Sequence, residues 1–334
     1  MNRMLLLAAR PVGDVKQSDF ELVEAPIPEP GPGEFVAEVT DISLDPAMRS
    51  WMNAGRSYIP PVQIGDVMRA YAIGRVIASR HDGFVAGDLV HGLFGVQEFA
   101  LSDGAGVLKI EPTDGIPRTA HLGVLGLTGM TAYFGLLDVG RFEAGQTVLV
   151  SGAAGAVGMT VGQIAKIKGG TAVGIAGGTE KCRLLVEELG FDAAIDYKAG
   201  DLLAQMRERT PDRVDVFFDN VGGTILDAGL TRIGHGARVV ICGAISQYNN
   251  TTAVTGPSNY LSLLTWRASM AGFIAYDYVD RYPDAVADLS RWLTEGRLTN
   301  IEHPVRGDIE AFPDVFQHLF AGQNTGKLVL EIKP

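Results

Sequence analysis

The sequence predicts an α/β protein with a β-rich N-terminal domain followed by a doubly wound domain built on a parallel sheet. Three observations support this. The chain has 334 residues, a length more typical of two domains than of one core. Residues 1–122 are dense in glycine and proline and contain short β-rich runs. Beyond Leu122, apolar strands alternate with helical stretches, a pattern typical of βαβ units and hence of a parallel sheet.

Short strands are predicted in the first domain. Phe35–Val39 and Gly74–Ala78 are rich in β-branched and other apolar residues, and turn signals such as Pro30–Gly33 separate such runs. Met4–Ala9 is apolar for only six residues, too few for a signal-peptide core or a membrane span, so it is predicted to be a strand. The domain is expected to comprise residues 1–122 and to be rejoined by 300–334, which contains the strand-like run Lys327–Ile332.

The second domain is expected over residues 123–299 as a regular alternation of strands and helices, accurate to a few residues at each boundary. The predicted strands are Thr147–Ser151, Ala172–Ala176, Ala193–Asp196, Val214–Asp219 and Ala237–Cys242. The predicted helices are Ala156–Lys168, Thr179–Leu189, Asp201–Arg209 and Thr224–Ile233.

Composition, residue spacing and missing motifs argue against several classes of function. The net charge of −11 disfavours nucleic-acid binding, which needs Lys and Arg to replace counterions on phosphates. The only cysteines are Cys182 and Cys242, too few for a disulfide framework or a four-thiolate zinc site, which favours a reducing, cytoplasmic location. The six histidines show no metal-ligand spacing, so catalytic zinc is not expected. The sequence contains neither the Gly-x-Ser-x-Gly nucleophile elbow of hydrolases nor the Gly-x-x-x-x-Gly-Lys-(Ser/Thr) phosphate loop of NTPases, so neither activity is expected.

The decisive motif is the run from Val148 to Gly158, an apolar strand that leads into closely spaced glycines and a helix. Glycine allows tight turning and lets the backbone approach a pyrophosphate, while the helix N-terminus supplies N–H groups to the phosphates. In its strand–loop–helix–strand context, the motif predicts a Rossmann dinucleotide-binding site. The alternative without a ligand is a tight turn in another kind of α/β protein.

The choice of nicotinamide cofactor depends on the end of the second strand. An acid about 20 residues beyond the first glycine would hold the ribose 2′-hydroxyl of NADH. Here the strand ends in Gly177-Gly178, and Lys181 lies one turn into the next helix. A cation at this point would neutralise a 2′-phosphate, so NADPH is favoured over NADH, although Lys181 also fits a solvated helix lysine.

Together these features resemble a known family. A β-rich domain followed by Ala153–Gly158, Asp219–Gly223 and Cys242–Ser246 is similar to the zinc-independent medium-chain dehydrogenase/reductases. The resemblance is to the branch of leukotriene B4 dehydrogenase/prostaglandin reductase, plant alkenal double-bond reductases and bacterial curcumin reductase. It runs from Leu44–Arg49 to Gly322–Lys327. It implies a GroES-like fold for the first domain, a homodimer, and substrate binding in a cleft between the domains.

The resemblance also implies particular cofactor contacts. It assigns the pyrophosphate to the glycine loop, the 2′-phosphate to Lys181, and adenosine or ribose to Tyr197. Other residues are implied to line the cofactor, mostly around the nicotinamide half, and for each the alternative is a loop residue without a ligand. The complete set is Ala154, Gly155, Ala156, Val157, Gly158, Lys181, Tyr197, Asn220, Cys242, Gly243, Ala244, Ile245, Ser246, Tyr248, a strand of Phe273, Ile274 and Ala275, and Asn324.

For catalysis the resemblance points to Tyr58 and Tyr260, which otherwise would be aromatic residues covering a domain interface. It implies hydride transfer from NADPH to the β-carbon of an α,β-unsaturated aldehyde or ketone, with no zinc. A tyrosine hydroxyl would stabilise the enolate, and Tyr260 or a water would protonate the α-carbon. Ala47 stands where many relatives have tyrosine, which puts proton transfer at that position in doubt. The alternatives are a quinone oxidoreductase and a non-catalytic NADPH-binding relative.

Overall fold

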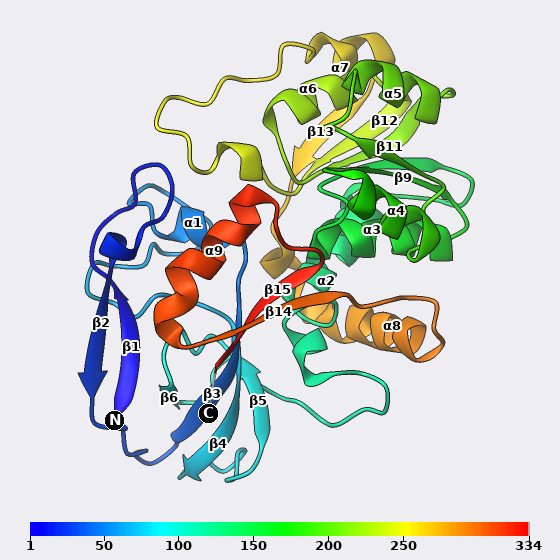
Figure 1. Cartoon of the computed structure of the whole chain (residues 1–334). Coiled ribbons are helices and arrows are strands. Elements are labelled where there is room, and N and C mark those ends of the chain that lie inside the picture. The colour runs from blue at the N-terminus through cyan, green and yellow to red at the C-terminus, as the bar shows by residue number, and fades with distance from the viewer. Residues whose placement is uncertain (333–334) are drawn as a thin grey trace. The chain divides into compact units, whose positions relative to one another are not determined.

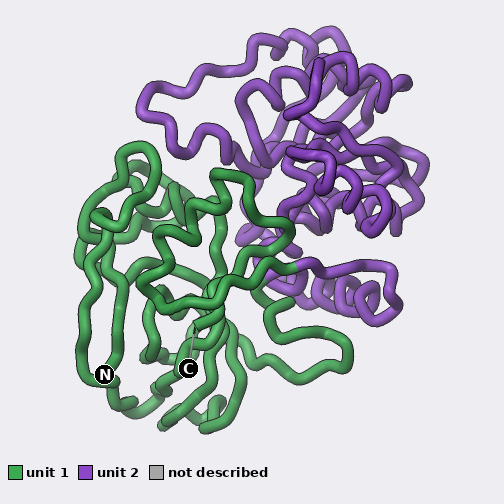
Figure 2. Tube along the Cα trace, viewed as in Figure 1, with its two compact units in different colours: residues 1–122, 302–334 green, residues 123–301 purple. Residues whose placement is uncertain are grey.

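The structure is a computed structural model that describes residues 1–332. The chain divides into two compact units, which are coloured separately in Figure 2. Unit 1 comprises residues 1–122 and the chain from Glu302 onward, and unit 2 comprises Gly123–Ile301. Within the described residues, no helix has the length and apolar character that crossing a bilayer requires.

Unit 1 is built on strands, as Figure 1 shows in blue, cyan and red. Its main sheet has the order β14-β15-β3-β4-β5-β7, with β6 on β3, while β1 and β2 form a separate antiparallel ribbon. The C-terminal strand β15 pairs antiparallel with β3. The strands are β1 (Asn2–Leu7), β2 (Phe20–Ala25), β3 (Phe35–Ser43), β4 (Ala72–Ser79), β5 (Leu89–Gly92), β6 (Phe99–Ser102), β7 (Leu108–Lys109), β14 (Glu302–Gly307) and β15 (Lys327–Ile332), and the helices are α1 (Ala47–Trp51) and α9 (Phe312–Ala321).

Unit 2 is a doubly wound domain. Its six parallel strands have the order β10-β9-β8-β11-β12-β13, so the winding direction reverses between β8 and β11. The strands are β8 (Thr147–Ser151), β9 (Thr171–Ala176), β10 (Ala193–Asp196), β11 (Val214–Asp219), β12 (Ile233–Ile241) and β13 (Ser269–Gly272). The helices are α2 (Leu127–Phe134), α3 (Ala156–Ile167), α4 (Thr179–Glu187), α5 (Leu202–Arg209), α6 (Gly223–Leu230), α7 (Leu261–Trp266) and α8 (Tyr282–Thr294).

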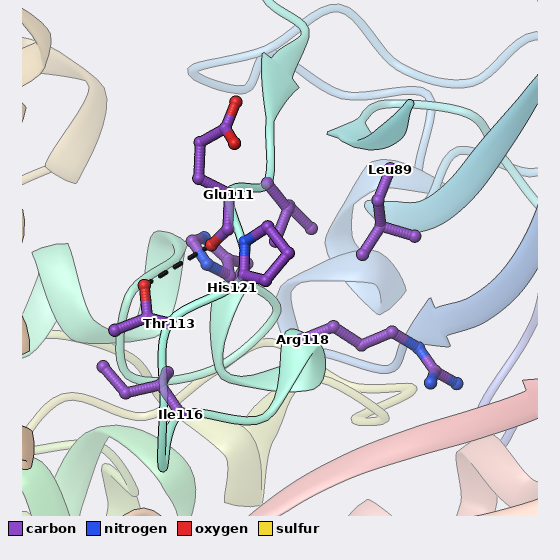
Figure 3. A pocket seen from close by; sticks show the side chains of 8 residues that line it. Leu89, Glu111, Thr113, Ile116, Arg118 and His121 are labelled. Carbon is purple, nitrogen blue, oxygen red and sulfur yellow. Dashed lines mark hydrogen bonds between the residues drawn. The ribbon is translucent and has the colours of Figure 1, made fainter. Parts of the chain in front are cut away.

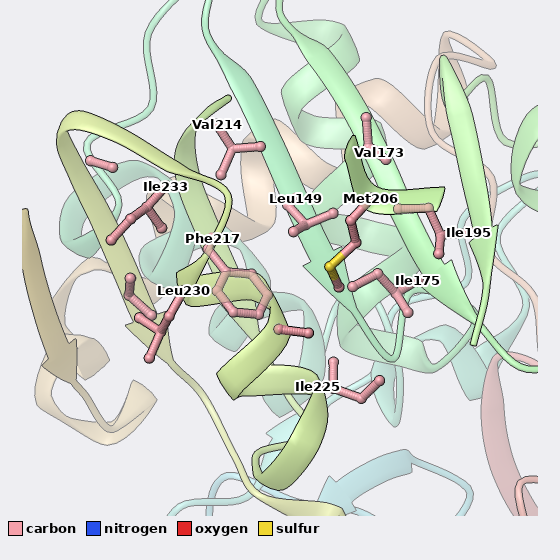
Figure 4. Close-up of a cluster of buried hydrophobic side chains, with 13 residues drawn as sticks. Leu149, Val173, Ile175, Ile195, Met206, Val214, Phe217, Ile225, Leu230 and Ile233 are labelled. Atoms are coloured by element: carbon pink, nitrogen blue, oxygen red, sulfur yellow. The ribbon is translucent and has the colours of Figure 1, made fainter. Parts of the chain in front are cut away.

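Helices cover both faces of this sheet, with α5 and α6 on one side and α3 on the other (Figure 1). On the first side, Met206 from α5 and Ile225 from α6 pack onto Leu149, Ile175 and Phe217 of the strands, which Figure 4 shows as one continuous cluster. All five side chains are buried. Burial of this apolar surface fixes the helices against the sheet and thereby fixes the loops that follow the strands.

Two predicted elements of unit 2 differ in the structure. Helix α6 ends at Leu230, and Ile233 belongs to β12, where it pairs with Val214. Its spacing of three from Leu230 fits a helical face, and its spacing of four from Ala237 fits one face of a strand, so periodicity could not separate the two. The predicted strand at Phe273–Ala275 was also wrong: β13 is Ser269–Gly272, and its pairing ends where β12 ends, at Ile241.

Candidate cofactor and active site

The loop between β8 and α3 has the geometry of a phosphate-binding turn. Gly152 has φ of 58°, in the left-handed region that favours glycine. A Cβ on Gly158 would lie 2.4 Å from the Gly152 carbonyl oxygen, so the helix can approach the loop only without a side chain there. The N–H groups of Ala156, Val157 and Gly158 lie in the first turn of α3, where no intrahelical acceptor is available. They can therefore donate to an anion at the positive end of the helix.

A cationic group lies at the ends of β9 and β10. Lys181 is in the first turn of α4 and is half-buried, and Lys198 follows Tyr197 after β10. Burial, and next the nearby charge of Lys198, lower the pKa of Lys181. The Lys198 Nζ lies 5.9 Å from the centroid of the Tyr197 ring. A dianionic phosphate would compensate the mutual repulsion of these ammonium groups.

The two glycines before α4 make room for this group. A Cβ on Gly177 would lie 2.8 Å from Cε1 of Tyr197 and 2.9 Å from Cε of Lys198. Gly178 has φ of 100°, and its N–H donates to Asp196 Oδ1 at 2.8 Å. The same Oδ1 accepts the N–H of Lys198 at 2.9 Å, so this carboxylate is engaged with the backbone. These residues fit a 2′-phosphorylated cofactor.

Asn220, predicted to line the cofactor, directly follows β11 at the reversal point of the sheet. Its N–H donates to Ser151 Oγ at 2.8 Å, and its Nδ2 donates to the Ser151 carbonyl at 2.7 Å. A Cβ on Gly152 would lie 3.4 Å from the Asn220 Cβ, which places Asn220 beside the first glycine of the loop. Doubly wound sheets bind ligands at this edge, beyond the carboxyl ends of the strands.

The segment from Cys242 to Tyr248 follows the next strand, β12, and is hydrogen-bonded to the end of β11 at Asp219. The N–H groups of Cys242 and Gly243 donate to the Asp219 carbonyl at 2.9 and 3.2 Å. Tyr248 folds back, so that its hydroxyl accepts the Ala244 N–H at 3.1 Å. Desolvation and then the Asp219 charge raise the pKa of Cys242 to about 12, so its thiol stays neutral and is not a nucleophile at ordinary pH.

Phe273 to Ala275 leave β13 and enter a short 3-10 turn that begins at Ala275. The Phe273 ring meets Phe218 edge-on, with 6.4 Å between the ring centroids. A Cβ on Gly135 would lie 2.5 Å from Phe273 Cζ, so the missing side chain lets this ring approach α2 and its following turn. The segment is therefore anchored by aromatic packing rather than by sheet pairing.

The remaining predicted residues are placed by other contacts. Tyr260 precedes α7 and is exposed, and its neighbour Asn259 is hydrogen-bonded to Asp227 in α6. Tyr58 belongs to unit 1, is exposed, and accepts the Trp51 Nε1–H at 2.9 Å. Asn324, also in unit 1, is buried, and its Nδ2 donates to the Gly326 carbonyl at 3.0 Å. Tyr58 and Asn324 thus lie in a different compact unit from the glycine loop.

A cavity of about 150 Å³ in unit 1 contains none of the predicted site residues (Figure 3). Leu89, Arg118 and His121 are among its lining residues, and the Arg118 guanidinium is engaged by both carboxylate oxygens of Asp41. Across residues 1–332, no cluster of three or more His, Cys, Asp or Glu side chains is arranged to hold a metal ion.

The structure adds four residues to this region that the sequence prediction did not select. They are Ser151, Asp196, Lys198 and Asp219. A signal existed for Lys198, a second basic residue directly after a predicted strand end. The roles of Ser151, Asp196 and Asp219 depend on contacts between neighbouring strands, which the sequence alone does not specify.

Comparison with known proteins places this architecture in a family. Residues 3–110 match the model described as the N-terminal domain of oxidoreductase, and residues 156–291 match the model described as zinc-binding dehydrogenase. The NADPH-dependent curcumin reductase of Escherichia coli is 39% identical, with 99% of this chain and 97% of that protein covered. The NADP-dependent 2-alkenal reductase of Nicotiana tabacum is 37% identical, with 99% and 97% covered.

A solved structure agrees over the whole chain. CurA from Vibrio vulnificus in complex with NADPH matches with a TM-score of 0.94 at 41% identity, and 99% of each chain is covered. The chain belongs to the medium-chain dehydrogenase/reductase family, in the branch of NADP-dependent curcumin, alkenal and prostaglandin reductases.

Proposed function

We propose that this protein uses NADPH to reduce the C=C bond of α,β-unsaturated aldehydes or ketones. The observation that carries the choice of cofactor is the convergence of Lys181 and Lys198 beside Gly177, at the end of a strand that carries no acid. The substrate class is supported by the relatives named as curcumin reductase and 2-alkenal reductase, and this chain covers 97% of the length of each.

In this proposal each group has a physical task. First-turn N–H groups of α3 hold the pyrophosphate, and the two lysines neutralise the 2′-phosphate. When bound, NADPH supplies the hydride that adds to the substrate β-carbon. The enolate oxygen is stabilised by a hydrogen bond from a tyrosine hydroxyl, and the α-carbon takes its proton from Tyr260 or from water. Asn220 and the Cys242–Tyr248 segment shape the nicotinamide end.

The test is NADPH oxidation, followed by absorbance, with a panel of enals, enones, quinones and saturated alcohols, repeated with NADH and with a chelator. We expect chelator-insensitive oxidation of NADPH with enones and recovery of the saturated carbonyl as product. Turnover of quinones alone would replace this proposal with quinone reduction. NADPH binding without turnover of any compound would replace it with a non-catalytic, cofactor-binding role.

We also propose that two copies associate through β13, the last strand of the six-stranded sheet. All four residues of β13 are exposed, and nearby Leu261 and Leu264 in α7 are 57% and 75% exposed. Proteins normally protect the edge strands of their sheets from uncontrolled pairing. Antiparallel pairing of β13 with β13 of a second copy about a two-fold axis would protect the edge in both copies. Light scattering should give a dimer mass, and Leu264→Lys with Met270→Lys should shift it toward monomer. A monomeric wild-type protein would contradict the proposal.

A further inference from the structure

One carboxylate at the candidate cofactor site is completely buried. Asp219, the last residue of β11, is 0% exposed. Its Oδ1 accepts the Ser151 hydroxyl at 2.6 Å and the Val221 N–H at 3.2 Å, and its Oδ2 accepts the Gly222 N–H at 2.9 Å. Desolvation raises the pKa of this carboxyl, and the three hydrogen bonds oppose that rise. A buried carboxylate is costly unless it is hydrogen-bonded, so these donors are needed to keep it there.

The carboxylate determines how Ser151 is used. A carboxylate can only accept, so the Ser151 hydroxyl must donate its proton to Asp219. The Ser151 Oγ then presents lone pairs to the Asn220 N–H, which donates to it at 2.8 Å. The Ser151 carbonyl holds the Asn220 side chain through Nδ2 at 2.7 Å. Both the backbone and the side chain of Asn220 are therefore positioned by Ser151, and Ser151 is oriented by Asp219.

The main chain extends this arrangement to a third loop. The Asp219 carbonyl accepts the N–H groups of Cys242 and Gly243. The Val221 carbonyl accepts both the N–H of Ser246, at 3.1 Å, and its hydroxyl, at 2.7 Å. The turn that begins at Asp219 thus connects the loops following β8, β11 and β12. The loops after β8 and β11 lie where these strands adjoin and the winding order reverses, and the loop after β12 lies beside them on the next strand.

We propose that Asp219 and Ser151 are positioning residues for the nicotinamide cofactor: together they hold Asn220 and the Cys242–Ser246 segment in register with the glycine loop. Neither needs to touch the cofactor, because Ser151 precedes the loop and the Asp219 side chain is enclosed by its three donors. The inference rests on the proposed use of NADPH. If Asp219 and Ser151 only stabilised the fold, substituting them would lower the thermal midpoint but leave the NADPH affinity of the folded protein unchanged. As positioning residues, they should weaken NADPH binding even in the folded protein.

The experiment measures the Kd for NADPH by fluorescence titration, and the thermal midpoint, for Ser151→Ala, Asp219→Asn and wild type. Thr210→Ala is the matched control. Thr210 is also buried and hydrogen-bonded, to Met206 and Arg232, but it lies before the opposite end of β11. We expect Ser151→Ala and Asp219→Asn to raise the Kd about 10-fold or more. Thr210→Ala should lower the midpoint and change the Kd less than about 2-fold.

The conservative variant Ser151→Thr keeps the hydroxyl, and its Kd should lie closer to that of wild type than to that of Ser151→Ala. Unchanged Kd values in Ser151→Ala and Asp219→Asn, with wild-type binding intact, would overturn this inference alone. Failure of the wild-type protein to bind NADPH would overturn the proposed function and this inference with it.

A measurement on the wild-type protein covers the case in which the variants do not fold. NADPH should slow amide hydrogen exchange together in peptides covering 219–222 and 242–246, because one hydrogen-bonded turn holds both. The peptide covering 206–212 should not respond. Protection of either site peptide without the other would overturn the inference.

Discussion

The ammonium of Lys327 lies 2.5 Å from Oδ1 of Asp45, and both residues are buried in unit 1. Lys327 Nζ also donates to the Leu44 carbonyl at 3.0 Å, and the Ser43 hydroxyl donates to the other carboxylate oxygen of Asp45. The pair joins the first residue of β15 to the turn that leads into α1. It therefore ties the C-terminal strand, and Asn324 just before it, to the segment that contains Ala47.

Removing one partner of this pair should destabilise the fold strongly. Lys327→Met leaves the Asp45 carboxylate buried without its cation, which is expected to lower the free energy of unfolding by about 3–5 kcal/mol. In Asp45→Asn/Lys327→Met no unpaired charge remains, so the double variant should lose less than the sum of the single losses. Urea denaturation of wild type, Asp45→Asn, Lys327→Met and the double variant provides the measurement. Additive losses would show that the two charges do not interact.

His91 should make stability depend on pH. It is buried and stacks on Tyr71, with 5.3 Å between ring centroids. Burial first, and then the charges of His121 and Lys327, lower its pKa from 6.5 to about 4. The unfolded chain therefore binds a proton below pH 6.5 that the folded chain takes up only near pH 4.

Stability should consequently fall as the pH drops from 6.5 to 4, by up to roughly 3 kcal/mol from this group. Urea unfolding across this range, compared between wild type and His91→Gln, isolates the contribution, and the variant should show a flatter profile. His235→Gln makes the same change at an exposed histidine and is the control for the substitution itself. An equal slope in wild type and His91→Gln would contradict the prediction.

Gly158 and Gly155 offer a paired test of the glycine loop. A Cβ at Gly158 would lie 2.4 Å from the Gly152 carbonyl oxygen, whereas one at Gly155 would come no closer than 3.3 Å to it. Gly158→Ala should therefore cost about 1–3 kcal/mol through overpacking, and Gly155→Ala should stay within about 1 kcal/mol. Chemical denaturation of both variants measures the difference. Equal losses would show that close packing of the helix on the loop is unimportant.

Local patterns predicted most of unit 2. The strands Thr147–Ser151, Ala193–Asp196 and Val214–Asp219 are confirmed with their boundaries, because each is a short apolar run between clear helical stretches. The error at Ile233 arose where one apolar residue satisfied both periodicities. The error at Phe273–Ala275 arose because the length of an edge strand depends on where its partner strand ends, and that information lies elsewhere in the chain.

The candidate site was predictable only in its local parts. The strand–glycine–helix motif and the basic Lys181 could be read from adjacent residues. The burial of Asp219 against Ser151 connects residues 68 positions apart, and nothing in the sequence near either one signals it. Asp196 likewise engages Gly178 from a neighbouring strand. Such contacts are set by the order of strands in the sheet, which only the folded chain determines.

The two lysines should determine the choice between NADPH and NADH. Lys181→Ala and Lys198→Ala each remove a cation from the proposed 2′-phosphate site, so the KM for NADPH should rise by about 10- to 100-fold. The KM for NADH should stay nearly unchanged, because NADH has no 2′-phosphate. Arg183→Ala is the control, since Arg183 lies in the same helix but is exposed and paired with Glu187. Equal losses for both cofactors would contradict the assignment.

Tyr260 should affect turnover rather than cofactor binding. If its hydroxyl protonates the α-carbon, Tyr260→Phe should lower kcat by about 100-fold and leave the Kd for NADPH within a factor of about two. Tyr58→Phe is the informative comparison, because it removes the acceptor of the Trp51 Nε1–H. A lower kcat in Tyr58→Phe would show that the required hydroxyl belongs to unit 1.

Because water competes for the same task, an unchanged kcat in Tyr260→Phe would assign the proton to water. A solvent deuterium isotope effect that persists in Tyr260→Phe would support that assignment, since proton transfer would still limit the rate.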